Sequence, residues 1–348
     1  MVSWENQNGK YVRDPRLGHR FGINYRGNDD DFNLETDNYG FIHNGNRERT
    51  TISKLNNSYR IFIIGGSAAM GMGASDNSKT IAAQLENELN KQGSKNYEVI
   101  NAACGGYCSW HSVIKLSLEL LTLKPNMIID ISGWNDMVHS SWGDKNEGNW
   151  IENHDRSIED VALSLMSLQG KINFTDLLLI RLRETKIFQY LKSKFLNLFN
   201  RNFTPKDIAW GHEKNKFKFR KNGVENYTRN LRTINGICES HKIKFLNILQ
   251  PSPIWIYLKN SNYINNNHKT SKDIIEYFKR DKNFEEVSGN FLIYLRELYQ
   301  NTNRNSWNIF DLADSEIFEI DDWIDHVHLS DKGQYKLAKY ISEMYIDF

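Results

Sequence analysis

A serine, a histidine and an aspartate occupy positions from which they could act together in acyl transfer. Ser67 follows Gly65 and Gly66 directly after a short apolar run, and glycines permit the tight turn on which a nucleophile can be exposed. His328 lies three residues after Asp325, a spacing that puts both side chains on one side of a helical turn. Asp325 could then orient His328 as the general base for Ser67. A Gly-rich turn with an incidental serine is the structural alternative.

The Asp-x-x-His spacing occurs a second time, at Asp136 and His139, so spacing alone does not select the base. Position in the chain separates the two pairs. His139 comes just after a candidate oxyanion donor, Asn135, whereas His328 directly precedes the last predicted helix and can reach across to Ser67.

Two further loops offer donors for a developing oxyanion. In the segment from Asn101 to Gly106, a glycine lets a substrate oxygen approach the backbone N–H of Gly106 closely. In the segment from Ser132 to Asp136, the side-chain amide of Asn135 could donate to the same oxygen. An ordinary turn and an Asx turn are the structural alternatives at these two places.

The elements that must position these residues alternate between strand and helix. Short β-branched and aromatic runs predict strands at 61–64, 97–100, 127–131, 243–249 and about 308–312. Helical spacing of apolar residues predicts helices at 80–89, about 110–123, about 226–241, within 273–299, and after Ser330, which is a good N-cap for a helix with Leu337, Ala338, Ile341 and Tyr345 on its apolar face.

This alternation predicts an α/β fold: a doubly wound, flavodoxin-like parallel sheet of about five strands with helices on both faces. Residues 1–58 are polar and predict an irregular or short-stranded N-terminal extension, and residues 59–348 form the main domain. A helical insertion is expected after the third strand, at about 140–223. It could cover the crevice and set specificity, or form a helical appendage or a partner surface.

Composition restricts the function class. The 348 residues are 39% hydrophobic and 25% charged, with a formal net charge of +1, which is ordinary for a globular protein and gives no electrostatic footprint for nucleic acid. No apolar run is long enough to span a membrane and no signal peptide is visible, so we expect a cytoplasmic protein. Three cysteines, Cys104, Cys108 and Cys238, are expected to be free thiols.

Taken together, these segments carry a family resemblance. Gly65-Gly66-Ser67, Asn101 to Gly106, Gly133-Trp134-Asn135-Asp136 and Asp325-His326-Val327-His328 resemble, in order, the four blocks of SGNH hydrolases, also called GDSL-type esterases. The resemblance covers about 60–136 and 224–348. Block one departs from the usual Gly-Asp-Ser, because Gly66 occupies the position of the Asp, which in the family is not a residue that reacts.

The resemblance implies that Ser67 is the nucleophile, His328 the base and Asp325 its orienting partner. It also implies that the backbone N–H groups of Ser67 and Gly106 and the amide of Asn135 form the oxyanion hole. The implied reaction is two-step acyl transfer through an acyl-enzyme, which requires no cofactor and no metal. A metal site of Cys104, Cys108 and His111 is conceivable from spacing, but buried structural roles are favoured because no fourth ligand is evident nearby.

Three tryptophans, Trp110, Trp134 and Trp323, neighbour these blocks and could stack on a sugar ring or line an acyl pocket, with core packing as the alternative. The favoured substrate is an O-acetyl or short-acyl ester of a small molecule or glycan. A lipid esterase or lysophospholipase, or an O-acyltransferase on the same triad, are alternatives. A non-catalytic ligand- or nucleotide-binding α/β domain is the alternative of another class, although the loop at residues 65–73 matches neither common phosphate-binding pattern. The oligomeric state is left open.

Overall fold

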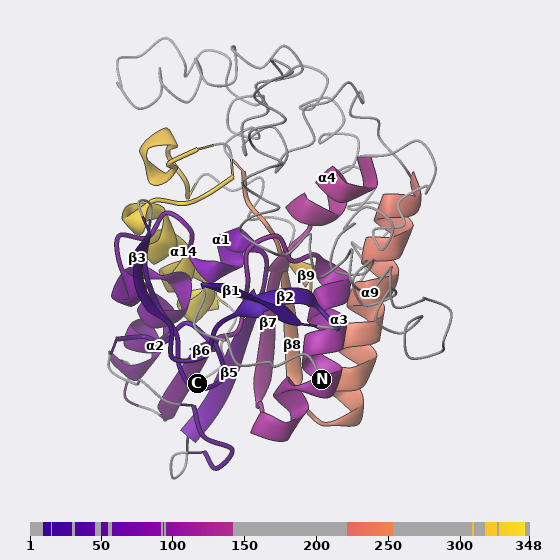
Figure 1. Ribbon diagram of the computed structural model, residues 1–348, viewed down its shortest axis with the longest axis horizontal. Coiled ribbons are helices and arrows are strands. Elements are labelled where there is room, and N and C mark those ends of the chain that lie inside the picture. The colour runs from indigo at the N-terminus through magenta and orange to yellow at the C-terminus, as the bar shows by residue number, and fades with distance from the viewer. Residues whose placement is uncertain are drawn as a thin grey trace, which may run out of the picture.

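A five-stranded parallel sheet forms the centre of the protein (Figure 1). Its strands are β5 (Ser58–Gly65), β6 (Asn96–Asn101), β7 (Met127–Ser132), β8 (Lys244–Leu249) and β9 (Asn308–Ile309). The computed structural model describes residues 10–14, 16–29, 32–45, 50–54, 58–91, 93, 95–141, 221–252, 308–309, 317–325 and 327–344. The spatial order β6-β5-β7-β8-β9 is the 2-1-3-4-5 order of flavodoxin-like folds, which confirms the predicted fold class.

Helices cover both faces of this sheet (Figure 1). One face carries α2 (Ile81–Lys91) and α14 (Asp331–Met344), and the other carries α3 (Ser109–Leu118) and α9 (Lys221–Ser240). Short elements complete the layers: α1 (Ser67–Met70), α4 (Trp134–Ser141) and the 3₁₀ turns η1 (Asn77–Lys79), η2 (Leu120–Leu123) and η5 (Ile320–Asp322). As predicted, Ser330 caps α14, accepting at 3.4 Å from the N–H of Gly333.

The strands consist mostly of apolar residues whose side chains are buried on both faces of the sheet, as expected for parallel strands between two layers of helices. Ile61, Ile63, Val99 and Ile129 are each 0% exposed. In the register, Ile63 lies beside both Asn101 and Ile129, so β5, β6 and β7 end at the same edge of the sheet. The loops that follow these three strands carry the first three sequence blocks, and they therefore meet at that edge.

The N-terminal segment folds into two antiparallel hairpins, β1 (Tyr11–Asp14) with β2 (Gly18–Phe21) and β3 (Arg26–Asp29) with β4 (Phe32–Glu35). Short strands agree with the sequence interpretation. Phe21 and Phe41 are 2% and 1% exposed and belong to the same hydrophobic core as the sheet. The N–H of Ile42 donates to the carbonyl of Asn101 at the end of β6. The segment is thus packed onto the sheet.

Some expectations lie outside the described residues. These are most of the insertion at about 140–223, the helix predicted within 273–299, and Tyr345. All three cysteines are buried, and none of them forms a disulfide, as expected. No helix in the described part of the chain is both long and apolar enough to cross a bilayer.

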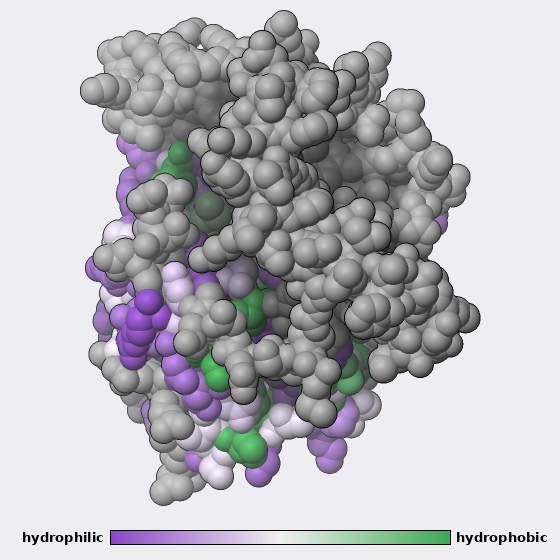
Figure 2. Space-filling view, viewed as in Figure 1, coloured by the Kyte–Doolittle hydropathy of each residue, from purple (hydrophilic) through white to green (hydrophobic). Residues whose placement is uncertain are grey.

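On the face shown in Figure 2, the described residues form a mixed surface on which hydrophobic side chains are scattered among hydrophilic ones. Large hydrophobic residues with substantial exposure come from separate elements of the chain: Tyr11, Ile23, Ile52, Leu118, Ile324 and Tyr335.

Candidate active site

Ser67, His328 and Asp325 form a continuous hydrogen-bonded chain. The Nε2 atom of His328 lies 2.8 Å from the Ser67 hydroxyl, and its Nδ1 lies 2.6 Å from Oδ2 of Asp325. An ionised carboxylate only accepts, so Nδ1 carries the hydrogen and the neutral ring leaves Nε2 free to accept from the serine. His328 is 4% exposed, whereas the Asp325 side chain is 31% exposed. This arrangement can move a proton from the Ser67 hydroxyl to Nε2.

Asp325 and His328 are brought together by a turn that Asp325 itself builds. Its Oδ1 accepts from the N–H groups of Val327 and His328 at 2.8 and 2.7 Å, as in an Asx turn. The loop is closed by a bridge between Trp323 and Leu329. The predicted proximity is therefore present, but the helical turn inferred from the spacing is wrong, because Asp325, Val327 and His328 lie in bends and irregular backbone rather than in a helix.

Gly66 is the residue at which the first block departs from Gly-Asp-Ser, and its neighbours leave little space for a side chain. A Cβ atom at this position would lie 2.5 Å from Nδ2 of Asn135 and 2.9 Å from the carbonyl oxygen of Tyr107. Asn135 donates from the same Nδ2 to that carbonyl at 2.9 Å. Since an amide nitrogen has two hydrogens, Tyr107 fixes the amide through one, and the other can donate to a further acceptor. The glycine lets the Asn135 amide lie directly against the backbone beside Ser67.

Gly106 has a φ of +79°, a left-handed conformation that residues with a Cβ rarely adopt. The loop before it is held to the Ser67 turn, because the N–H of Cys104 donates to the carbonyl of Gly65 at 3.1 Å. Asn101 adds a second link by donating to the carbonyl of Met70 at 2.9 Å. Ser67 begins α1, and the first N–H groups of a helix have no carbonyl partner within it.

Asp136, the residue after Asn135, ties α4 to the start of α3. Its carboxylate accepts from the N–H of Ser109 at 3.1 Å and from the Ser109 hydroxyl at 2.5 Å. Desolvation raises the pKa of Asp136 to about 7, against the lowering effect of these hydrogen bonds. The side chain of the alternative base, His139, lies outside the described residues. The carboxylate of Asp136 bonds Ser109 at the start of α3.

Two of the three tryptophans that neighbour the blocks are buried in the hydrophobic core. Trp134 and Trp323 are 4% and 1% exposed and belong to the hydrophobic core. This burial agrees with the core-packing alternative, and a substrate-lining role for the tryptophans stays a prediction. Trp110 is half-buried, and its ring centroid lies 3.8 Å from that of His111.

The Cys108 and His111 pair has a structural role at the start of α3. The N–H of Cys108 donates to Nδ1 of His111 at 2.9 Å, and the pair forms a capping box. Among the residues that the structure describes, no group of three or more His, Cys, Asp or Glu side chains is arranged to hold a metal ion.

Two glutamines that the sequence did not single out hold the His328 loop in place. Gln334 of α14 is 0% exposed; its Oε1 accepts from the N–H of Ile81, and its Nε2 donates to the carbonyls of Met72 and Leu329. Gln250, directly after β8, donates to the carbonyl of Val327. The sequence signal for Gln250 was its place at a strand end, and Gln334 showed only as a polar residue near the start of a helix.

No protein-family model matches the sequence, and no curated protein matches it. Solved structures do align with it. An acetyl xylan esterase aligns at 13% identity over 82% of this chain and 100% of its own, with a TM-score of 0.41. A lipase/acylhydrolase from Enterococcus faecalis aligns at 15% identity over 81% and 93%, with a TM-score of 0.39.

A catalytic mutant of an acetylxylan esterase from Geobacillus stearothermophilus aligns at 12% identity over 83% of this chain and 95% of its own, with a TM-score of 0.39. The chain's own strand order and the position of the four blocks at one edge of the sheet are independent of these alignments. The chain therefore has a flavodoxin-like α/β fold, and the segments that resemble the four SGNH blocks lie together at one edge of its sheet.

Proposed function

We propose that the protein is a serine hydrolase that cleaves a carboxylic ester through an acyl-enzyme. The observation that carries the proposal is the chain of hydrogen bonds from Ser67 through His328 to Asp325, 2.8 and 2.6 Å long. A nucleophile, a base and an orienting carboxylate in this geometry are the parts that acyl transfer needs. A nucleotide-binding role would leave the contact between Ser67 and His328 without a purpose.

In the first step Ser67 Oγ attacks the ester carbonyl while its proton passes to Nε2 of His328. The resulting oxyanion is stabilised by the N–H groups of Ser67 and Gly106 and by the second amide hydrogen of Asn135. His328 then gives the proton to the departing alcohol. In the second step His328 takes a proton from water, which attacks the acyl-enzyme. His328 then returns that proton to Ser67 Oγ as the bond between Oγ and the acyl group breaks and the acid leaves.

Within this class we favour an O-acetyl or other short-acyl ester of a small molecule or carbohydrate. A lipid esterase or lysophospholipase would use the same three residues with a longer acyl group. An O-acyltransferase would use them with water excluded and an alcohol acceptor in its place. These alternatives share Ser67, so the acyl length and the acceptor separate them.

The test is hydrolysis of nitrophenyl acetate, butyrate and octanoate by the wild type, Ser67→Ala and Ser117→Ala, purified in parallel. Ser117 is an exposed serine on α3 whose hydroxyl donates to the carbonyl of Val113, so it controls for the loss of any serine. We expect Ser67→Ala to lose at least about 10³-fold in kcat and Ser117→Ala to match the wild type.

Preference for acetate supports the short-acyl substrate, and preference for octanoate supports the lipid esterase. Product that forms only when an alcohol is added indicates acyl transfer. Equal rates for the wild type and Ser67→Ala would contradict the proposed function.

A further inference from the structure

The N-terminal hairpin β1–β2 contacts the Gly105–Gly106 loop through two hydrogen bonds. The Nε2 atom of His19 lies 2.8 Å from the carbonyl oxygen of Gly105, which can only accept, so the ring N–H is the donor. In return, the hydroxyl of Tyr107 donates to the carbonyl of His19 at 2.6 Å. The two bonds lie on either side of Gly106 in the sequence. The hairpin thus holds the loop on both sides of a proposed oxyanion donor.

The bond to the Gly105 carbonyl also determines where the N–H of Gly106 points. The two groups belong to the same peptide unit, and the described chain contains no cis peptide bonds. In a trans peptide the C=O and N–H directions are opposed and the unit is planar. By binding the carbonyl on one side, His19 directs the Gly106 N–H to the other side and opposes rotation of the peptide.

The ring of His19 is itself held firmly. It packs edge-on against Tyr11 and Tyr107, with ring centroids 5.5 and 5.3 Å apart. Burial lowers the pKa of His19 below its ordinary value. Carbon Cε1 of this ring is the nearest atom, at 3.8 Å, to a Cβ built on Gly106.

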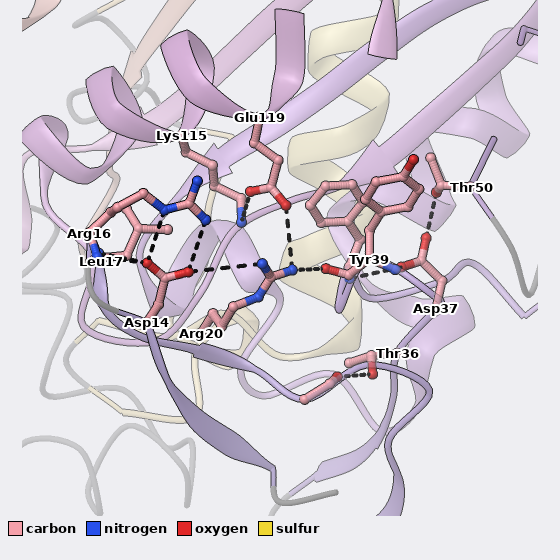
Figure 3. A network of polar contacts seen from close by, with 12 residues as sticks. Asp14, Arg16, Leu17, Arg20, Thr36, Asp37, Tyr39, Thr50, Lys115 and Glu119 are labelled. Carbon is pink, nitrogen blue, oxygen red and sulfur yellow. Dashed lines mark hydrogen bonds and ion pairs between the residues drawn. The ribbon is translucent and has the colours of Figure 1, made fainter. Parts of the chain in front are cut away.

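A polar network fixes the hairpin to the main domain (Figure 3). Asp14 at the end of β1 accepts from the N–H groups of Arg16 and Leu17 and from the Arg16 side chain. Arg20 of β2 pairs with Asp14 at 3.9 Å and with Glu119, directly after α3, at 3.4 Å. It also donates to the carbonyl of Tyr39. These bonds place His19 at a defined position relative to α3.

We propose that His19 is a positioning residue of the oxyanion hole, which acts by holding the Gly105–Gly106 peptide so that its N–H faces the substrate oxygen. The inference rests on the proposed function, because it assigns the first 58 residues a part in that same site. The N-terminal segment then contributes to transition-state stabilisation without touching the substrate.

The test compares His19→Phe, which keeps a ring but removes the donor, with His19→Gln, whose amide can still donate to the Gly105 carbonyl. On the nitrophenyl ester that the wild type prefers, we expect His19→Phe to lower kcat by up to about 10²-fold with KM unchanged. His19→Gln is expected to retain most of the wild-type kcat. Inhibition by phenylboronic acid, whose tetrahedral adduct on Ser67 places an oxygen in the hole, should weaken in parallel with kcat.

The matched control is His43→Phe. His43 belongs to the same N-terminal segment, and its ring bonds Glu35 at 2.8 Å and the N–H of Gly45 at 3.1 Å. We expect this variant to lose stability in thermal unfolding but to keep kcat.

Wild-type kcat in a folded His19→Phe protein would overturn the inference while Ser67→Ala still tests the proposed function. Equal losses in His19→Phe and His19→Gln would also overturn it, since the donor would then not matter. An inactive wild type would contradict the proposed function and this inference together.

Discussion

At the scale of single residues, the amide of Asn135 is held between two neighbours with different roles. The carbonyl of Tyr107 accepts one of its hydrogens at 2.9 Å. Gly66 leaves open the space in which the amide lies, because a Cβ there would come within 2.5 Å of Nδ2. Preorganised donors contribute most when their position is fixed before charge develops. The missing side chain at residue 66 is therefore part of the proposed oxyanion site.

Gly66→Ala tests this statement with a single added methyl group. The backbone at Gly66 has φ −85° and ψ −157°, an extended conformation open to alanine, so the expected effect is steric. We expect kcat to fall by roughly 10²-fold, as for the loss of one oxyanion donor, with KM little changed. Steady-state kinetics on a nitrophenyl ester measures both constants.

Gly236→Ala in α9 is the matched control, because a Cβ there would have no atom within 4 Å apart from the neighbouring backbone of its own helix. It should keep kcat and raise stability slightly, since alanine is the better helix former. Full kcat in Gly66→Ala would show that Asn135 does not need its present position.

The sequence predicted which residues meet at this site better than how they are oriented. Ser67 and Asn135 follow runs that predict strands, and the carboxyl ends of parallel strands meet at one edge, so their approach could be predicted. The turn at Asp325 could not, because an aspartate three residues before a histidine fits a helical turn and an Asx turn equally well. Only the rest of the loop, closed between Trp323 and Leu329, decides between them.

At the scale of elements, the Asp136 carboxylate links α4 to the first residue of α3. It accepts from both the N–H and the hydroxyl of Ser109. A helix N-terminus favours negative charge, but desolvation has the larger effect and raises the pKa of Asp136 to about 7. Nearby Asp130 also has a pKa raised by burial, to about 6. The ionised form of Asp136 therefore costs folding free energy.

Asp136→Asn should flatten the pH dependence of stability. A carboxyl with a higher pKa in the folded than in the unfolded chain releases its proton on unfolding between those two values. The free energy of unfolding of the wild type should then fall as pH rises from about 4 to about 7, by at most ~1.4 kcal/mol per pH unit for one group. Asparagine keeps an oxygen for Ser109 but does not titrate.

Urea unfolding of both proteins at pH 5, 6, 7 and 8 measures this dependence. Asp130 titrates in both proteins, so the informative quantity is the difference between the two curves. Parallel curves across this range would contradict a raised pKa at Asp136.

Element positions followed closely from the sequence, since buried parallel strands are short runs of β-branched residues and the helices have clear apolar faces. The strand predicted at 127–131 is β7, Met127–Ser132, and the helix predicted at about 226–241 is α9, Lys221–Ser240. The helix predicted at about 110–123 is instead divided into α3 and η2. Periodicity persists through such a break because the 3₁₀ turn still buries Leu120 and Leu123.

At the scale of the whole molecule, the N-terminal segment shares one hydrophobic core with the sheet. Phe41 is 1% exposed, its ring meets that of Phe62 in β5 at a centroid distance of 6.0 Å, and the Nζ atom of Lys115 lies 5.0 Å from its centroid. Leu17 and Ile42 are 2% and 1% exposed in the same core. Polar composition concealed this packing, because a few apolar residues spaced along an irregular segment produce no periodic signal.

Phe41→Ala should therefore destabilise the entire fold. Removing a buried phenylalanine costs about 3–5 kcal/mol through lost burial and the cavity left behind. We expect one cooperative urea transition, with the same midpoint by circular dichroism and by tryptophan fluorescence. This midpoint should lie at a lower urea concentration than in the wild type, and the free energy of unfolding should be lower by that amount.

Ile23→Ala is the control within the same segment, since Ile23 is 37% exposed and its loss should change stability by no more than ~0.5 kcal/mol. A separate early transition in Phe41→Ala would instead show that the N-terminal segment unfolds independently.

The hydrogen bond between Ser67 and His328 joins residues 261 positions apart, while Asp325, His328 and the helix that anchors them lie close together near the end of the chain. The entropy lost on closing a loop grows only with the logarithm of its length, about 0.6 kcal/mol for each doubling. Evolution can therefore lengthen, shorten or exchange the connecting segments with little change in the free energy of bringing Ser67 and His328 together. In the proposed hydrolase, substrate preference and catalysis can therefore diverge separately.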